Sequence, residues 1–126
     1  EMNETTPNNV IDIMEEQKAG LNDNMRMGNF DCGLIDGSKL KEIYGANCIQ
    51  ERHHHRYEFN NKYKEQFEEA GMKCVGINPL TKLVEAVEVE NHPWYIGVQY
   101  YPQYNSTVLK PHPLFLSFIK AAIENN

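Results

Sequence analysis

Three consecutive histidines, His53, His54 and His55, are the residues best suited by type to metal chemistry. On a β-strand, alternate side chains point the same way, so His53 and His55 would share a face with room for one ion. Zinc usually takes three or four protein ligands, and the sequence places no further histidine, cysteine or acidic motif to complete them. We therefore predict no metal site and interpret the cluster as a polar strand end.

The three cysteines are the next candidates for chemistry. Cys32, Cys48 and Cys74 are odd in number, widely spaced and contain no Cys-x-x-Cys pair. Disulfide frameworks and zinc sites both use closer, paired spacings. The pattern favours reduced thiols in a cytoplasmic protein.

Five aromatic residues near the C-terminus could form a stacking surface for nucleic-acid bases. They are Trp94, Tyr95, Tyr100, Tyr101 and Tyr104. However, the formal net charge is -6, and affinity for phosphate comes mostly from Lys and Arg. The sequence therefore favours packing in a core or pocket over binding to nucleic acid or to an anionic membrane. No apolar run approaches the ~20 residues that span a bilayer.

A chain of 126 residues with 40% hydrophobic content suits one globular domain. Short helices and strands must position these residues within it. Residues 1–9 form a polar N-terminal segment. Ser38 is a candidate cap for a helix over residues 39–44, which Gly45 would end. We expect further helices over residues 10–17, 62–70 and 113–125, and strands over residues 25–35, 48–59, 72–77, 83–89 and 95–101.

Several blocks of sequence, in order, resemble those of one enzyme family. Residues 24–28 read Asn-Met-Arg-Met-Gly, where the family has Thr-Met-Arg-Leu-Gly. Residues 50–60 read Gln-Glu-Arg-His-His-His-Arg-Tyr-Glu-Phe-Asn, and the family has Glu-Arg-His-Arg-His-Arg-Tyr-Glu-Val-Asn. The blocks Glu-Ala-Gly, Leu-Val-Glu, His-Pro-Trp and Lys-Pro-His-Pro-Leu-Phe follow at residues 69, 83, 92 and 110. The chain thus resembles the glutaminase domain of the CTP synthase family, a class I glutamine amidotransferase.

The resemblance implies a fold and an extent. It predicts an α/β, partial class I amidotransferase fold, a mostly parallel sheet flanked by helices. Residues 10–126 correspond to the C-terminal half of the glutaminase domain. In the family the nucleophilic cysteine lies upstream, on a Gly-x-Cys-x-Gly elbow. Cys32, in Asp31-Cys32-Gly33, lacks the first glycine, so the resemblance assigns this chain no nucleophile.

The resemblance also identifies two altered triad positions. The family turn is His-Pro-Glu, and here Tyr101-Pro102-Gln103 stands in its place. In that chemistry a histidine accepts the thiol proton and a carboxylate orients the imidazole. A phenol ionises only near pH ~10 and an amide carries no charge. We therefore predict that Tyr101 and Gln103 are catalytically inactive and reflect a site that has drifted.

Arg56 matches the family arginine that binds the α-carboxylate of glutamine. A planar guanidinium suits such bidentate binding, although a structural arginine at a strand end explains the residue equally well. His54 replaces a family arginine where the glutaminase meets the synthase domain, which weakens any expectation of interdomain coupling.

The predicted function is therefore a CTP-synthase-like glutaminase domain fragment, inactive as this chain. The parent reaction, in pyrimidine nucleotide synthesis, converts UTP, ATP and glutamine to CTP. ATP and Mg would bind the synthase domain, so this chain would hold no cofactor itself. Expected partners are glutamine, a full-length CTP synthase or the other half of the domain. Two alternatives are a non-enzymatic module that binds or regulates an active CTP synthase, and a small-ligand binder that uses Arg56.

Overall fold

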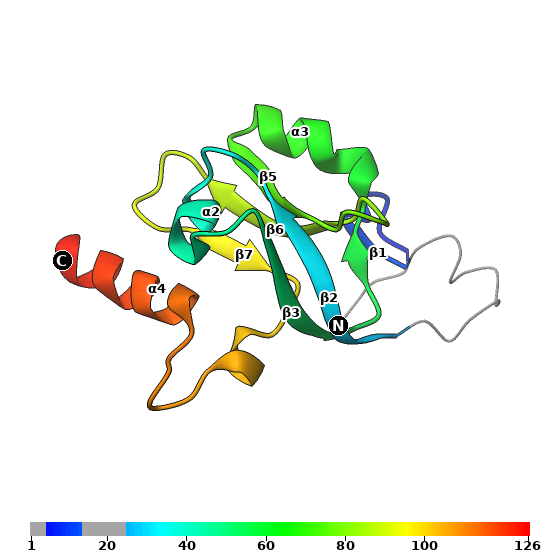
Figure 1. Cartoon of the computed structure of the whole chain (residues 1–126). Coiled ribbons are helices and arrows are strands. Elements are labelled where there is room, and N and C mark those ends of the chain that lie inside the picture. The colour runs from blue at the N-terminus through cyan, green and yellow to red at the C-terminus, as the bar shows by residue number, and fades with distance from the viewer. Residues whose placement is uncertain (1–4, 14–24) are drawn as a thin grey trace.

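One five-stranded sheet positions most of the side chains discussed below (Figure 1). The structure, a computed structural model, describes residues 5–13 and 25–126. The strands of this sheet are, in chain order, Arg26–Leu34 (β2), Cys48–His55 (β3), Met72–Ile77 (β5), Val84–Val89 (β6) and Ile96–Val98 (β7). Their order across the sheet is β3–β2–β5–β6–β7, so β3 and β7 are the two edges.

The neighbouring strands of this sheet all run antiparallel. The expectation of a mostly parallel sheet is therefore wrong for the described part of the chain. Parallel neighbours need a crossover connection of about a dozen residues or more. Residues 78–83 alone join β5 to β6, and residues 90–95 alone join β6 to β7. These connections are too short for a crossover.

Helices nevertheless flank both faces of the sheet, which confirms the α/β class (Figure 1). The helix α3 (Lys64–Glu69) packs on one face, where the rings of Phe67 and Phe59 meet edge to face at 5.6 Å. The helices α2 (Lys39–Tyr44) and α4 (Pro113–Glu124) pack on the other. Their residues Leu40 and Leu114 are buried there with Cys32 and Val75.

A second, two-stranded sheet pairs Ile11–Asp12 (β1) with Glu58–Phe59 (β4). The helix predicted over residues 10–17 is therefore wrong at its start, and residues 14–17 lie outside the described residues. Val10 and Ile11 pack against the buried Phe59. This packing, together with the strand pairing, outweighs the helical spacing that the sequence shows.

The helix ends follow their local sequence. The Ser38 hydroxyl accepts a hydrogen bond from the backbone N–H of Lys41 at 3.1 Å, and Gly45 ends α2 with φ of 64°. Asn60 caps the 3₁₀ turn η1 (Asn61–Tyr63), which leads directly into α3. The predicted caps Ser38 and Gly45 are thus confirmed, because they depend only on nearby residues.

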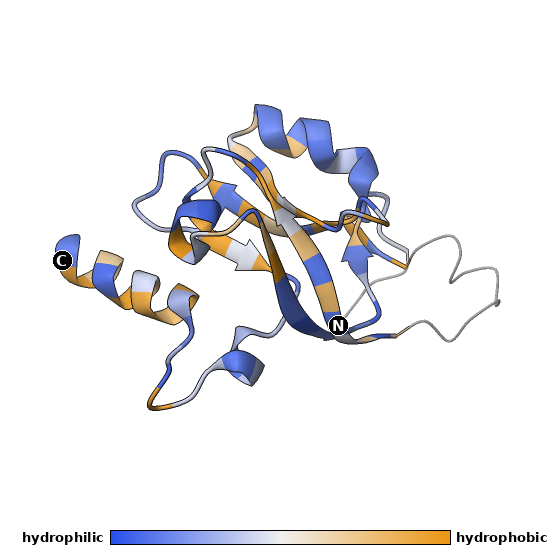
Figure 2. Cartoon of the chain, viewed as in Figure 1, coloured by the Kyte–Doolittle hydropathy of each residue, from blue (hydrophilic) through white to orange (hydrophobic). Residues whose placement is uncertain are grey.

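The helix α4 rests on the molecule through a narrow contact. Leu114 is its buried residue, whereas Leu116, Ile119 and Ile123 are 55%, 56% and 73% exposed. Figure 2 shows apolar residues along this helix. The indole Nε1 of Trp94 donates to the Ser117 hydroxyl at 2.8 Å. Within the described residues, no helix is long and apolar enough to cross a membrane.

Candidate functional site

The turn that carries Tyr101 and Gln103 is fixed by backbone hydrogen bonds to two strands. It follows β7 and begins the 3₁₀ turn η2 (Pro102–Asn105), whose first residue is a proline. The N–H of Gln99 donates to the carbonyl of Glu85 in β6 at 2.8 Å. The N–H of Tyr101 donates to the carbonyl of Arg52 in β3 at 2.9 Å. The chain entering the turn is therefore hydrogen-bonded to β6 through Gln99 and to the edge strand β3 through Tyr101.

The side chains of this turn face the surface. Tyr101 is half-buried and Gln103 is exposed. The rings of Tyr101 and Tyr104 lie 5.8 Å apart, and the Arg52 guanidinium stacks 5.3 Å from the centre of the Tyr104 ring. The expected packing of aromatic residues in the core is confirmed for Tyr100, which is buried, and for Trp94, which packs against the same core cluster. Tyr101 and Tyr104 instead form a surface pair that carries an arginine.

Arg56 lies just beyond the strand that supports this turn. It is exposed and follows directly after the end of β3. Arg52, which holds the Tyr101 backbone, is four residues earlier, so the two arginine backbones are at most roughly 14 Å apart. A shared site of Arg56 with Tyr101 and Gln103 stays a prediction.

The three cysteines, all within the described residues, occupy strands rather than a strand-to-helix elbow. Cys32 lies inside β2 and is fully buried, Cys48 opens β3, and Cys74 is buried in β5. Burial, reinforced by the nearby Glu85 carboxylate, raises the pKa of the Cys32 thiol well above its ordinary value. Because the thiolate is the attacking species, Cys32 is a core residue and an unsuitable nucleophile.

A buried ion cluster joins residues of β2, β4 and β6. One Arg26 nitrogen is 3.2 Å from both carboxylate oxygens of Glu58, and the other binds Glu85. The Asn78 amide also donates to Glu85, at 3.3 Å. The Glu58 and Glu85 side chains are 1% and 0% exposed. Such carboxylates are tolerated inside a protein only when paired, so Arg26 is the residue on which the cluster depends.

His53 and His55 of β3 form a hydrogen-bonded chain. His55 Nδ1 lies 3.0 Å from the Tyr57 carbonyl, which can only accept, so this nitrogen carries the proton. In a neutral imidazole His55 Nε2 must then accept, and His53 Nδ1 donates to it at 2.7 Å. The expected shared face of His53 and His55 is confirmed. Three of their four ring nitrogens are engaged with each other or with backbone, which leaves His53 Nε2 facing Glu85 at 3.7 Å.

Protonation of this region changes stability in a calculable direction. Burial, followed by the nearby Arg26 charge, lowers the pKa of His53 to about 3 and of His55 to about 4. Burial raises the pKa of Glu58 to about 6, although Arg26 opposes it. A histidine with a lowered pKa stabilises the fold above its unfolded pKa of 6.5 and loses that contribution as the pH falls. The raised pKa of Glu58 has the opposite effect on stability. Its contribution to the free energy of unfolding is present at low pH and is lost as the pH rises through about 6.

The two histidines outweigh the single carboxyl, so acidification should destabilise the fold. We expect the free energy of unfolding to fall by about 2 kcal/mol between pH 7 and pH 5. Urea titrations followed by fluorescence of Trp94, the single tryptophan, measure this change. The variant His55→Gln should reduce the fall, whereas the exposed-site control His92→Gln should not. An unfolding free energy equal at the two pH values would show that the histidine chain does not titrate as described.

A second buried network was not predicted from the sequence. Glu51 Oε1 lies 2.7 Å from His112 Nε2 and accepts from the Tyr44 hydroxyl at 2.9 Å, and Glu51 Oε2 accepts from the Asn105 amide at 2.7 Å. Burial alone would raise the pKa of Glu51, but these hydrogen bonds outweigh it and hold the pKa below its ordinary value. Glu51 and His112 are 61 residues apart. The available signal was a glutamate on the inward-facing side of a strand, with a histidine placed before a helix-starting proline.

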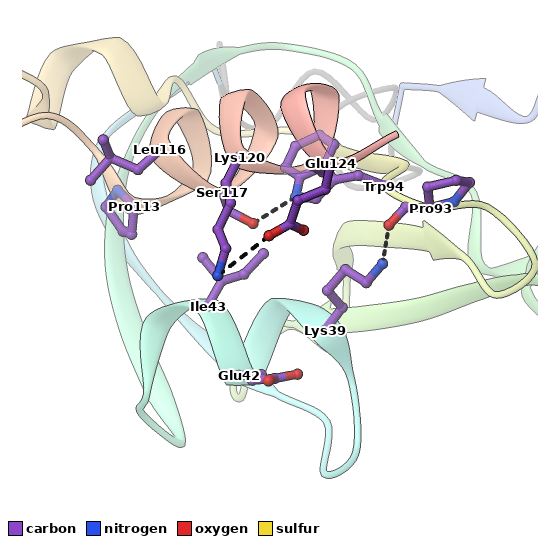
Figure 3. Close-up of a pocket in the computed structure, with 11 residues that line it drawn as sticks. Lys39, Glu42, Ile43, Pro93, Trp94, Pro113, Leu116, Ser117, Lys120 and Glu124 are labelled. Carbon is purple, nitrogen blue, oxygen red and sulfur yellow. Dashed lines mark hydrogen bonds and ion pairs between the residues drawn. The ribbon is translucent and has the colours of Figure 1, made fainter. Parts of the chain in front are cut away.

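A groove between α2 and α4, of about 480 Å³, is separate from this site (Figure 3). Its ammonium groups already have partners. Lys39 donates to the Pro93 carbonyl, and Lys120 lies 3.9 Å from Glu124. None of the groove residues belongs to the Tyr101 turn. Within the described residues, no group of three or more histidine, cysteine or acidic side chains could hold a metal ion.

Comparison with known proteins gives one consistent result. Residues 6–121 match the family described as glutamine amidotransferase class-I. A CTP synthase of Bacteroides thetaiotaomicron is 62% identical over 127 residues, which cover 99% of this chain and 24% of that protein. A CTP synthase of Bacteroides fragilis is 63% identical over 126 residues, with 98% and 24% covered. The chain thus spans about a quarter of the length of these relatives.

The fold has a solved counterpart. The structure of the Trypanosoma brucei CTPS glutaminase domain with bound acivicin superimposes with a TM-score of 0.89 at 33% sequence identity. The match covers 97% of this chain and 48% of that chain. The antiparallel sheet, its helices and the turn that bears Tyr101 therefore have the arrangement of about half of a glutaminase domain.

Proposed function

The chain belongs to the class I glutamine amidotransferase family, and we propose that it is part of the glutaminase domain of a CTP synthase that does not hydrolyse glutamine. The parent reaction transfers the amide nitrogen of glutamine to UTP to give CTP, while ATP is hydrolysed to ADP and phosphate and glutamine becomes glutamate. ATP and Mg would bind outside this chain. The setting we propose is the cytoplasm, consistent with three unpaired cysteines.

The observation that supports the proposed inactivity is a turn fixed by backbone hydrogen bonds that carries Tyr101 and Gln103, the two residues that the sequence resemblance aligns with the family's base and orienting carboxylate. Hydrolysis needs a group that accepts the thiol proton near neutral pH and later delivers it to the leaving ammonia. Gln103, two residues after Tyr101, is exposed, and its amide has no charge with which to stabilise an imidazolium. The backbone scaffold is kept, whereas the proton-transfer groups are not.

The test uses a chimera of the Bacteroides thetaiotaomicron relative, in which this chain replaces the segment that it matches (62% identical). CTP formation from UTP and ATP is measured with glutamine and, separately, with ammonium chloride as nitrogen source. We expect ammonium to support CTP formation and glutamine to give background rates. Equal rates with the two nitrogen sources would contradict the proposal. No activity with ammonium would indicate a misfolded chimera. The positive control is a chimera whose segment carries the family's His-Pro-Glu turn.

We further propose that Arg56 retains the role of binding the substrate carboxylate. Its position directly after β3, the strand whose Arg52 carbonyl accepts from the Tyr101 N–H, supports this role. In the chimera with Tyr101→His/Gln103→Glu, we expect Arg56→Lys to raise KM for glutamine at least about 10-fold, because an ammonium cannot bind a carboxylate in a bidentate manner. Rates with ammonium should not change. An unchanged KM would identify Arg56 as a structural residue.

A further inference from the structure

The buried Glu51 carboxylate links β3 to three other elements, one of which is the 3₁₀ turn η2 that follows Tyr101. It lies in β3 and is 3% exposed. It binds Asn105 at the end of η2, His112 at the start of α4, and Tyr44 at the end of α2. A carboxylate has about four lone-pair positions on two oxygens, and three are used here. Such a buried charge is retained only when hydrogen bonds compensate for its lost hydration.

The histidine of this network has a defined orientation. His112 caps α4, since its Nδ1 accepts from the backbone N–H of Leu114 at 3.2 Å. An accepting Nδ1 in a neutral imidazole places the proton on Nε2. His112 Nε2 therefore donates to Glu51 at 2.7 Å. One side chain thus fixes the start of α4 and ties it to β3.

Asn105 is the direct link from Glu51 to the turn. It is the last residue of η2, the 3₁₀ turn that contains Gln103 and follows Tyr101. The N–H groups of Tyr104 and Ser106 donate to the carbonyls of Tyr101 and Gln103, at 3.1 and 3.3 Å. The other end of the turn is held by Arg52, next to Glu51 in the same strand. Both ends of the turn are thus attached to adjacent residues of β3.

We propose that Glu51 is the positioning residue of the triad turn, and that it acts through Asn105 and His112. The role rests on the proposed function, because it concerns the positions that Tyr101 and Gln103 occupy. Glu51 itself touches no reacting atom. It sets where the side chains at positions 101 and 103 lie relative to the strand that leads to Arg56.

Two variants separate this role from a general effect on folding. Asn105→Ala removes the link to the turn and leaves the bonds of Glu51 to His112 and Tyr44. His112→Asn keeps a good helix-capping residue but is too short to reach Glu51. The control Val108→Ala changes a side chain in the same loop that is 98% exposed.

The first readout is the kinetics of the chimera with Tyr101→His/Gln103→Glu. A displaced catalytic group lowers kcat more than it changes substrate binding, and a misplacement of about 1 Å can cost 10²-fold. We expect Asn105→Ala and His112→Asn each to lower kcat with glutamine about 10- to 100-fold. KM for glutamine, rates with ammonium and the Val108→Ala control should stay unchanged. A kcat unchanged by both variants would overturn the proposal.

The second readout does not need glutamine hydrolysis. In the unmodified chimera, hydrogen exchange at the amides of Tyr104 and Ser106 should accelerate at least about 10-fold in Asn105→Ala, because the turn opens locally. Amides of β5 and β6 should keep their protection. Unchanged exchange at both turn amides would overturn the positioning role. If the double variant is inactive with glutamine yet exchange accelerates, the altered turn is not the cause of the inactivity, whereas the attachment of the turn to Glu51 stands.

Discussion

The double change Tyr101→His/Gln103→Glu is expected to raise glutamine-dependent CTP formation by the chimera at least about 10³-fold, since loss of single triad residues costs roughly 10⁴ to 10⁶ in kcat. The backbone of the turn is already fixed to β6 and β3. New side chains therefore enter a preorganised position. The nucleophile in this experiment comes from the relative's part of the chimera.

The single variants identify which residue limits the reaction. Tyr101→His alone should recover only part of the rate, because no carboxylate orients the imidazole. Gln103→Glu alone should recover nothing, because a carboxylate without a histidine cannot relay the thiol proton. Ammonium-dependent rates should be the same in all four proteins. A double variant that remains at background with glutamine, while ammonium still works, would show that the turn is not the cause of inactivity.

The second large effect concerns stability, and it follows from removing the charge of Arg26. The change Arg26→Met leaves two carboxylates, Glu58 and Glu85, in a buried site without their counterion. Breaking a buried ion cluster by removing one partner costs about 3–5 kcal/mol. We expect a loss of this size in the free energy of unfolding, measured by urea titration of the chain with Trp94 fluorescence.

Two further proteins control this result. Lys120→Met removes an exposed partner of Glu124, whose side chain is 60% exposed, and should cost less than about 1 kcal/mol. Adding Glu58→Gln and Glu85→Gln to Arg26→Met should recover part of the loss, since the unpaired charges are gone. If Arg26→Met is no more costly than Lys120→Met, the buried cluster does not hold the fold together.

Local sequence predicted the features that depend on a few neighbouring residues. The Ser38 cap, the Gly45 stop and the shared face of His53 and His55 are examples. Each depends on backbone geometry within one turn of helix or on alternate residues of one strand. The family resemblance extended this to the α/β class and to the amidotransferase family.

The remaining features depend on contacts between distant residues. Arg26 and Glu85 are 59 residues apart, and Asn105 and Glu51 are 54 apart. No spacing rule connects such pairs. The same reason explains the wrong helix at Ile11, whose strand partner Phe59 cannot be read from local periodicity. The error in strand direction came from applying the whole family's sheet to a segment whose strands have short connections.

The proposed inactivity is tested most directly by the rate at which the unmodified chimera releases ammonia from glutamine. We expect release at the background rate of a sample without protein, with CTP formation from ammonium intact. Release clearly above background would contradict the proposed inactivity.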